Sequence, residues 1–262
     1  MLIGVAAAVL AVVLAAVGVD FGITIVAEYR LSRTVRAANS LHWDPSVAIL
    51  GFPLIPQAMR HHYSEIEIKA NDVEQIHVGK ASLEATLHAI DLTDSSWLIR
   101  PDAKLPVGKL ESRIIIDSAH LGRFMGIKDL MVEAPARETN DATGGTTESG
   151  ISDSHGLVFT GTPKSAGFDK RVSISVDLSI SGAENTTLVF TPTGVMTGPG
   201  TADQEVPEDR RAAVLHAFRA SLPDQRLPFG VAPTSQGARG SDVIIEGITK
   251  GLTVSVAEFR QS

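Results

Sequence analysis

The chain has 262 residues, of which 44% are hydrophobic and 20% are charged, so it is long enough for one large domain or two small ones. Thirty acidic residues against 23 basic ones give a formal net charge of -7. Because no long basic run is present and only 5% of residues are aromatic, the composition argues against nucleic-acid binding. The absence of cysteine excludes thiol catalysis, disulfide bonds and thiolate metal sites.

The N-terminal residues 2–19, LIGVAAAVLAVVLAAVGV, contain no charge. As a helix this segment would be about 27 Å long, close to the ~30 Å hydrocarbon core of a bilayer. It predicts a transmembrane anchor or an export signal, with a buried core helix as the weaker alternative. Anchor and signal both stay open, because no Lys or Arg precedes the segment and the small residues around Gly18 match a cleavage site only loosely. We therefore divide the chain into this segment, residues 1–19, and a domain over residues 20–262.

Residues 25–40 have the spacing of an amphipathic helix, with apolar residues every three or four positions at Ala27, Leu31, Val35 and Ala38. Three arginines fall on a different face, Arg30, Arg33 and Arg36. They are interpreted as a solvated stripe. Alternatively, they contact anionic lipid headgroups beside the membrane, where each would contribute about 1 kcal/mol.

The next segment, ILGFPLIPQAM at residues 49–59, is uncharged and contains two prolines. Because proline lacks a backbone donor and restricts the chain, we expect an apolar loop here, and neither a regular helix nor a central strand.

After residue 60 the apolar residues alternate with polar ones, which is typical of half-buried antiparallel strands. SGAEN at residues 181–185 predicts the turn of a hairpin. The segments with this pattern are residues 65–69, 75–78, 81–89, 109–116, 156–160, 171–181, 185–191, 241–246 and 251–258.

Two short helices are expected between the strands. Asp117 is the expected N-cap of the first, whose apolar face carries Leu121, Phe124 and Met125. The second begins at Pro207 and ends at Pro223, with an apolar stripe of Leu215, Phe218 and Leu222. Residues 138–155 are rich in Ser, Thr, Gly and acidic residues, and we expect a mobile loop. The fold class is therefore α+β with β dominant.

No common catalytic motif is present: the nucleophile elbow Gly-x-Ser-x-Gly, His-Glu-x-x-His, the Walker A loop and Gly-x-Gly-x-x-Gly are all missing. His61, Glu65 and Glu67 could share one side of a strand as metal ligands, but a solvated strand face accounts for them better. We expect no enzyme activity, no metal and no cofactor.

Three segments, VAILGFPLIPQAM, YSEIEIKANDVEQIHVGKASLEATLHAIDL and LPFGVAPTSQGARGSDVIIEGITKGLTVSV, resemble the LmeA family of phospholipid-binding envelope proteins from actinobacteria. The matching positions are Gly51–Leu54, Tyr63, Leu227–Phe229 and Gly247. The chain departs from the family pattern at Leu54, where a second aromatic is frequent, and at His62, where glycine is frequent.

The resemblance implies a fold similar to that of the tubular lipid-binding proteins, in which a strongly curved antiparallel sheet wraps around amphipathic helices and leaves an apolar lumen. It also implies a place in the cell envelope, either anchored to the plasma membrane or secreted to its periplasmic side. Some members are implicated in elongating the mannan of lipoglycans at the outer face of that membrane.

The residues themselves agree with a lipid-binding role. A sheet of this length with one apolar face must curl to cover it, and each methylene buried there is worth about 0.8 kcal/mol. The segment at 49–59 then becomes either a rigid lip or lining of a lipid cavity, or a plug of the core. We take as candidate lipid-binding residues Phe52, Leu54, Ile55, Tyr63, Leu121, Phe124, Met125, Leu215, Phe218 and Phe229.

The leading hypothesis is a non-catalytic phospholipid-binding or lipid-transfer protein at the membrane surface, with phospholipid and membrane as partners and no nucleic acid. The alternatives are a structural or adaptor protein that binds a protein partner through its sheet and, with less support, an envelope enzyme acting on glycan or lipid.

Overall fold

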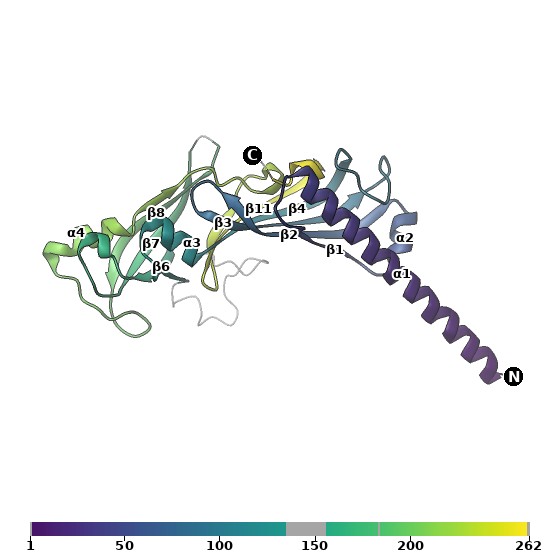
Figure 1. The fold of residues 1–262 in the computed structure, drawn as a ribbon, viewed down its shortest axis with the longest axis horizontal. Helices are drawn as coiled ribbons and strands as arrows, with labels where there is room; N and C mark the ends of the chain where they lie inside the picture. The colour runs from purple at the N-terminus through teal and green to yellow at the C-terminus, as the bar shows by residue number, and fades with distance from the viewer. Residues whose placement is uncertain (1, 135–155, 183, 261–262) are drawn as a thin grey trace.

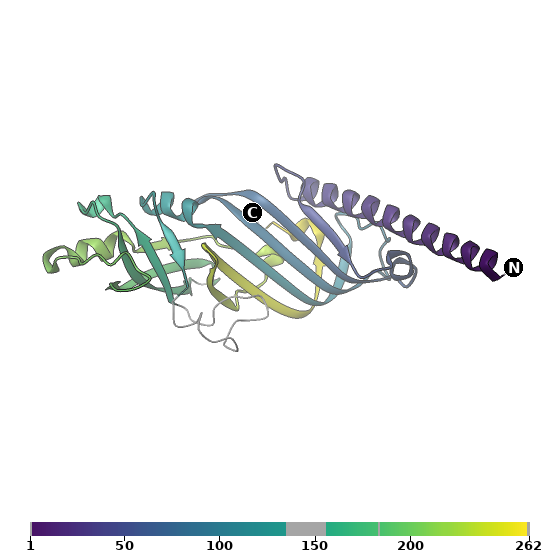
Figure 2. The same cartoon turned by 90° about the horizontal axis from the view of Figure 1, so that it is seen from below.

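The computed structural model describes residues 2–134, 156–182 and 184–260, which form two antiparallel sheets arranged end to end, with a long N-terminal helix projecting at one end (Figures 1 and 2). The first sheet has six strands in the order β1-β2-β3-β4-β11-β10 and curls into a half-barrel. The second has five strands in the order β5-β6-β7-β8-β9. This β-dominant architecture confirms the predicted fold class. The expected mobile loop at 138–155 lies outside the described residues.

The first sheet uses strands from both ends of the chain. Its strands are β1 (Ser46–Leu50), β2 (His62–Gln75), β3 (Gly79–Asp91), β4 (Lys104–Asp117), β10 (Ser235–Arg239) and β11 (Asp242–Ser255). The chain leaves this sheet after β4, builds the second sheet, and returns to pair β11 with β4 along almost its whole length. The segments expected as two strands at 241–246 and 251–258 are one long strand.

The second sheet contains β5 (Met131–Glu133), β6 (Gly156–Gly161), β7 (Val172–Ser181), β8 (Thr187–Met196) and β9 (Ala220–Leu222). The hairpin expected around SGAEN joins β7 and β8. Phe159 and Phe190 pack at its centre with ring centroids 5.5 Å apart. Its apolar face is continuous with the core of the first sheet, so the two sheets share one hydrophobic interior.

The helices are α1 (Leu2–Ala38), α2 (Leu54–Met59), α3 (Ser118–Met125) and α4 (Glu208–Ala217), with short 3-10 turns η1 (Lys164–Ala166), η2 (Pro228–Gly230) and η3 (Val256–Glu258). The side chain of Asp117 accepts from the amides of Ala119 and His120, which confirms it as the N-cap of α3. The expectation that the second short helix runs to Pro223 was wrong, because α4 ends at Ala217 and residues 220–222 pair with β8 as strand β9.

A second expectation was also wrong: residues 54–59 form the helix α2, although Pro56 lies inside it. Proline is tolerated in the first turn of a helix, because the backbone amides there have no partner within the helix. The predicted loop is therefore confined to Gly51–Pro53.

The apolar segment 2–19 and the amphipathic segment 25–40 form one continuous helix, α1. Its second half is held along one stripe. The amide of Ile49, in edge strand β1, donates to Glu28 at 2.8 Å, and the hydroxyl of Ser32 donates to the carbonyl of Pro45 at 2.6 Å. Asn39 donates to the carbonyl of Val256 at 2.9 Å. Between these polar contacts Ala27, Leu31 and Val35 are buried, so this half of α1 belongs to the folded domain.

Candidate functional site

The inner face of the six-stranded sheet is an apolar trough. Over most of β2, β3 and β4 buried side chains alternate with more exposed ones, as the alternation in the sequence predicts, and the register shifts in β2 between Ala70 and Val73. One cross-strand row joins Ile49, Ile66, Leu87 and Leu110. This is the apolar wall expected from the alternating pattern.

Most of this trough is filled by the protein's own side chains. The second half of α1 closes it along β1, and the segment around η2 covers the far side. There Phe229 packs edge-on against Phe259, with ring centroids 5.7 Å apart. Gly247 makes this approach possible, because a Cβ there would come closer than 3.0 Å to the carbonyl of Ala232 and to the side chains of Leu227 and Val231. The trough is therefore not an open tunnel in this structure.

A hollow of about 180 Å³ remains between α1 and the loop of residues 92–103, and we call it the α1 slot. Its apolar walls are built by Ala27 and Leu31 of α1, Ile49 of β1, and the loop. The residues that line the slot are Ala27, Arg30, Leu31, Thr34, Ile49, Trp97, Leu98, Ile99, Arg100 and Pro101.

The loop of residues 92–103 is fixed at three points. Its first residue, Leu92, donates its amide to the carbonyl of His61 at 2.8 Å. The hydroxyl of Tyr63 donates to the carbonyl of Trp97 at 2.8 Å, and the hydroxyl of Ser255 donates to the carbonyl of Pro101 at 2.8 Å. Tyr63 is completely buried, and burial raises the pKa of its hydroxyl to about 12, so this donor stays protonated at physiological pH. The outer wall of the slot is thus held in a defined position.

Two of the slot residues carry positive charge. Arg30 lies on α1, and Arg100 lies on the loop opposite with its side chain 73% exposed. Arg100 pairs with Asp102, with Nε and the carboxylate 3.9 Å apart and both side chains more than 70% exposed, which makes a weak pair. An apolar slot flanked by two arginines matches a ligand that has a hydrocarbon part and an anionic group.

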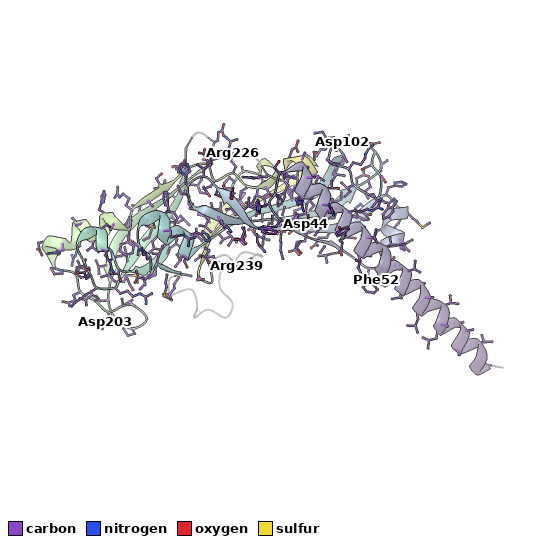
Figure 3. The ribbon with its side chains drawn as sticks, viewed as in Figure 1. Asp44, Phe52, Asp102, Asp203, Arg226 and Arg239 are labelled. Carbon is purple, nitrogen blue, oxygen red and sulfur yellow. The ribbon has the colours of Figure 1, made fainter. Side chains whose placement is uncertain are left out.

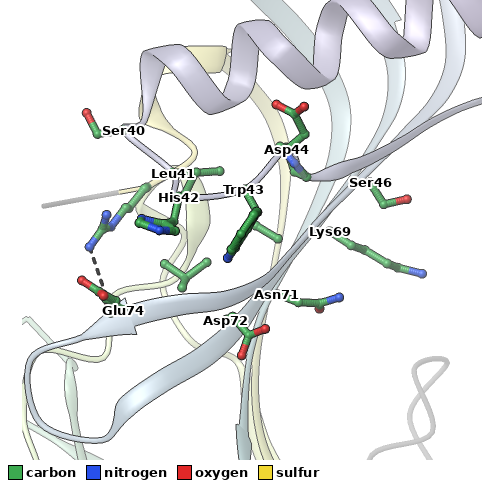
Figure 4. A pocket seen from close by; sticks show the side chains of 14 residues that line it. Ser40, Leu41, His42, Trp43, Asp44, Ser46, Lys69, Asn71, Asp72 and Glu74 are labelled. Atoms are coloured by element: carbon green, nitrogen blue, oxygen red, sulfur yellow. Dashed lines mark hydrogen bonds between the residues drawn. The ribbon is translucent and has the colours of Figure 1, made fainter.

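A second hollow, of about 320 Å³, lies beyond the C-terminal end of α1 (Figure 4). Leu41, His42 and Trp43 lie along one wall, with Asp72 and Glu74 opposite. The guanidinium of Arg260 donates to the main-chain carbonyl of Glu74 at 3.1 Å. Two of its three acids form ion pairs, Asp44 with Arg36 at 3.0 Å and Asp72 with Lys80 at 3.4 Å. This mixed polar lining does not suit an acyl chain.

The outer face of the same sheet carries a network of charges. Arg113 of β4 lies between Glu84 of β3 and Glu246 of β11, and its Nε donates to Glu246 at 2.6 Å. Burial alone would raise the pKa of Glu111 in the next cross-strand row, but Lys109 and Arg113 outweigh it and hold that pKa below its usual value. The network lies on the face of the sheet opposite the trough, is largely buried, and lines none of the hollows described above.

His61, Glu65 and Glu67 do not form a metal site. Within the part of the chain that the structure describes, no group of three or more His, Asp or Glu side chains is arranged so that it could hold a metal ion. His88, which the sequence did not single out, lies 3.3 Å from Glu65 and 3.2 Å from Glu111 and links these acids across the sheet.

The ten candidate lipid-binding residues do not form one site. Four lie around α2 and the start of β2: Leu54 and Tyr63 are buried, Ile55 is half-buried, and Phe52 is 62% exposed. Leu121, Phe124 and Met125 lie on α3, between the two sheets. Leu215 and Phe218 lie at α4, near the opposite end of the molecule from α2 (Figure 1). Phe229 lies in η2 and packs in the core.

Of these residues only Tyr63 acts directly on the α1 slot, through its bond to Trp97. Sequence reasoning missed the loop of residues 92–103 as a wall of the slot. The available signal was the uncharged stretch Trp97–Ile99 inside an otherwise polar loop. Arg30, one of the arginines considered for lipid headgroups, does line the slot.

The family model described as LmeA-like phospholipid-binding matches residues 18–248. The chain belongs to this family. A search of curated proteins and a search of solved structures each gave no significant match.

Membership of the LmeA-like family indicates phospholipid as the ligand class. Within the described residues, α1 is the one helix that is long and apolar enough to cross a membrane, a property that a signal sequence shares. Phospholipid binding and association with a membrane are therefore supported by independent features of the chain.

Proposed function

We propose that this LmeA-like protein is a non-catalytic phospholipid-binding protein that takes an acyl chain into the α1 slot at the membrane surface. The observation that carries the proposal is the slot itself, an apolar hollow flanked by two arginines and formed in part by the helix whose first half is apolar enough to enter a bilayer. Family membership supports the choice of a phospholipid over other amphipathic ligands.

The size of the slot implies that it widens on binding. Sites for small molecules are commonly about 300–1,000 Å³, larger than the 180 Å³ found here. The slot can widen where α1 packs against the loop of residues 92–103, a contact that we call the seam. In the described part of the chain, the hydrogen bonds that attach α1 go to α2, β1, the segment after α1 and the C-terminal residues, and none goes to this loop.

Opening that seam would separate packed apolar side chains but would break no hydrogen bond. Each methylene of an entering chain returns about 0.8 kcal/mol, so a few methylenes offset the loss of apolar packing around Ala27 and Leu31. The phosphate would lie at the rim, where Arg30 and Arg100 attract it from opposite sides.

We extend the proposal to lipid transfer and to a location at the outer face of the plasma membrane, where the protein would support elongation of lipoglycan mannan. These extensions draw their support from the sequence resemblance, and the apolar half of α1 is consistent with a membrane location.

Native mass spectrometry of the 262-residue chain, released from lipid nanodiscs, tests the core proposal. We expect the wild type to retain phospholipid, and Thr34→Phe to lose it because the larger side chain fills the slot. Ala37→Phe is the matched control, since residue 37 is exposed on α1 away from the slot. Wild-type protein that carries no phospholipid, or equal retention by both variants, would refute binding in the slot.

A further inference from the structure

Three large apolar side chains are exposed where α1 enters the folded domain. Phe21 is 57% exposed, Phe52 is 62% exposed and Met59 is 77% exposed. We call these three residues the foot. Phe21 belongs to α1, Phe52 precedes α2 and Met59 ends α2, so the foot joins two elements that are separate in the sequence. Figure 3 shows Phe52 beside α1.

The foot is continuous with the membrane-compatible part of α1. Residues 5–19 of that helix are apolar and almost entirely exposed. Phe21 follows Val19 by two residues, which is about 3 Å along the helix axis. The rings of Phe21 and Phe52 stack with centroids 5.5 Å apart and an interplanar angle of 25°. Phe52 is thereby held at the level at which α1 would leave the bilayer.

A buried carboxylate fixes this arrangement. Asp20 is only 3% exposed and accepts from the backbone amides of Leu54 at 2.9 Å and Ile55 at 2.8 Å. These are amides at the N-terminus of α2, which have no partner within the helix. At the other side of α2, the amide of Ser64 donates to the side chain of Gln57 at 2.8 Å. α2 is therefore tied to both α1 and β2 and does not move independently.

From this continuity we propose that the foot is a second membrane contact, in which Phe21, Phe52 and Met59 insert into the interfacial layer of the bilayer. Bulky apolar and aromatic side chains are favoured there. Residues 49–59 carry no charge, and the next residue, Arg60, is exposed and suited to anionic headgroups. The same segment also contributes to the core through Leu54, which is 2% exposed.

Contact with the bilayer through both α1 and the foot would restrict the orientation of the domain, which one helix alone does not do. A single spanning helix leaves the attached domain free to tilt, whereas a helix and a foot together fix its orientation. The α1 slot begins at Ala27, seven residues beyond Asp20, so the slot would be held roughly 10 Å above the foot. This inference concerns how the domain docks on the bilayer and does not rest on lipid binding in the slot.

The 262-residue chain has no cysteine, so a single introduced thiol reports on one position. We would attach a spin label at Met59→Cys or Phe52→Cys, reconstitute the protein in vesicles containing anionic phospholipid, and measure accessibility to oxygen and to a water-soluble nickel chelate. The control is Ile76→Cys, because Ile76 is 89% exposed but lies beyond the opposite end of β2, about 40 Å away along the strand.

We expect labels at positions 52 and 59 to be reached by oxygen and shielded from nickel, and the label at 76 to show the reverse. If the labels at 52 and 59 are as accessible to nickel as the label at 76, the foot does not enter the membrane and the proposal is wrong. Because two foot positions are read separately, failure of one variant to fold leaves the other to decide.

Discussion

Glu246 of β11 accepts a hydrogen bond of 2.6 Å from Nε of Arg113 in β4, and the side chain of Glu246 is only 1% exposed. The two residues are 133 positions apart in the chain and directly opposite each other in the sheet. The pair therefore connects the last long strand to the strand that precedes the second sheet, and it favours one register for that long-range pairing.

Replacing Arg113 with Met should destabilise the fold by about 3–5 kcal/mol, because it removes the guanidinium that donates to the buried Glu246 carboxylate. The matched change, Arg36→Met, removes an ion pair with Asp44 whose side chains are both more than 40% exposed, and it should cost less than about 1 kcal/mol. Denaturant unfolding of the two variants in the same detergent gives the comparison. Equal losses would mean that the Arg113 network does not hold the sheet.

Stability should fall at high pH because of Tyr63. Burial raises the pKa of its hydroxyl from 10 to about 12, so the folded state favours the protonated form. The contribution of the protonated hydroxyl to the free energy of unfolding is complete below pH 10. It is lost as the pH rises from 10 to about 12, and the change is about 2–3 kcal/mol.

Tyr63→Phe should remove this part of the pH dependence, whereas Tyr29→Phe, at an exposed position on α1, should leave it in place. Unfolding measured at pH 9, 10, 11 and 12 tests both variants. A Tyr63→Phe protein with the same alkaline loss as the wild type would show that the buried hydroxyl is not its source.

Gly247→Ala should be destabilising by about 1–3 kcal/mol, since its Cβ would overlap the main chain at Ala232 and two packed side chains. Gly194→Ala is the control, because a Cβ there meets nothing within 4 Å. Thermal unfolding should separate the two variants clearly. A stable Gly247→Ala protein would indicate that the segment before β10 can move away from the sheet.

The two arginines of the slot predict a preference for anionic headgroups. Arg30→Gln combined with Arg100→Gln should weaken binding of an anionic phospholipid several-fold while changing binding of a zwitterionic one less, and the effect should shrink as salt is raised. The single variant Arg33→Gln is a control, because Arg33 lies on the same helix but does not line the slot. The measurement is lipid occupancy by native mass spectrometry at two salt concentrations. The arginine assignment fails if the double variant and Arg33→Gln behave alike.

Local patterning predicted much of the fold. Alternation indicated β2, β3, β4 and β7, because a strand with one face buried records that burial in every second residue. The N-cap at Asp117 and the hairpin that joins β7 to β8 were also predicted correctly, since capping and hairpin formation depend on a few adjacent residues.

Features that depend on distant contacts could not be predicted in the same way. Nothing near Pro56 indicates that Asp20, more than thirty residues earlier, caps the helix that contains it. The sequence left open whether Phe52 forms a lip or lining of a lipid cavity or a plug of the core, and its exposed position, with the ring stacked on Phe21, depends on a contact with a residue 31 positions earlier. The α1 slot depends on the contact of Tyr63 with Trp97, which is fixed by the tertiary fold and not by the local pattern.

The most direct test of the central claim uses a phospholipid with a photoreactive group in its acyl chain and the full-length protein in nanodiscs. After cross-linking and digestion, mass spectrometry locates the label. Binding in the slot predicts label on residues 27–34 and 97–101, reduced by excess unmodified phospholipid and by Thr34→Phe but not by Ala37→Phe. Label confined to residues 2–21 and the foot would contradict it, because the chain would then contact lipid only as part of the surrounding bilayer.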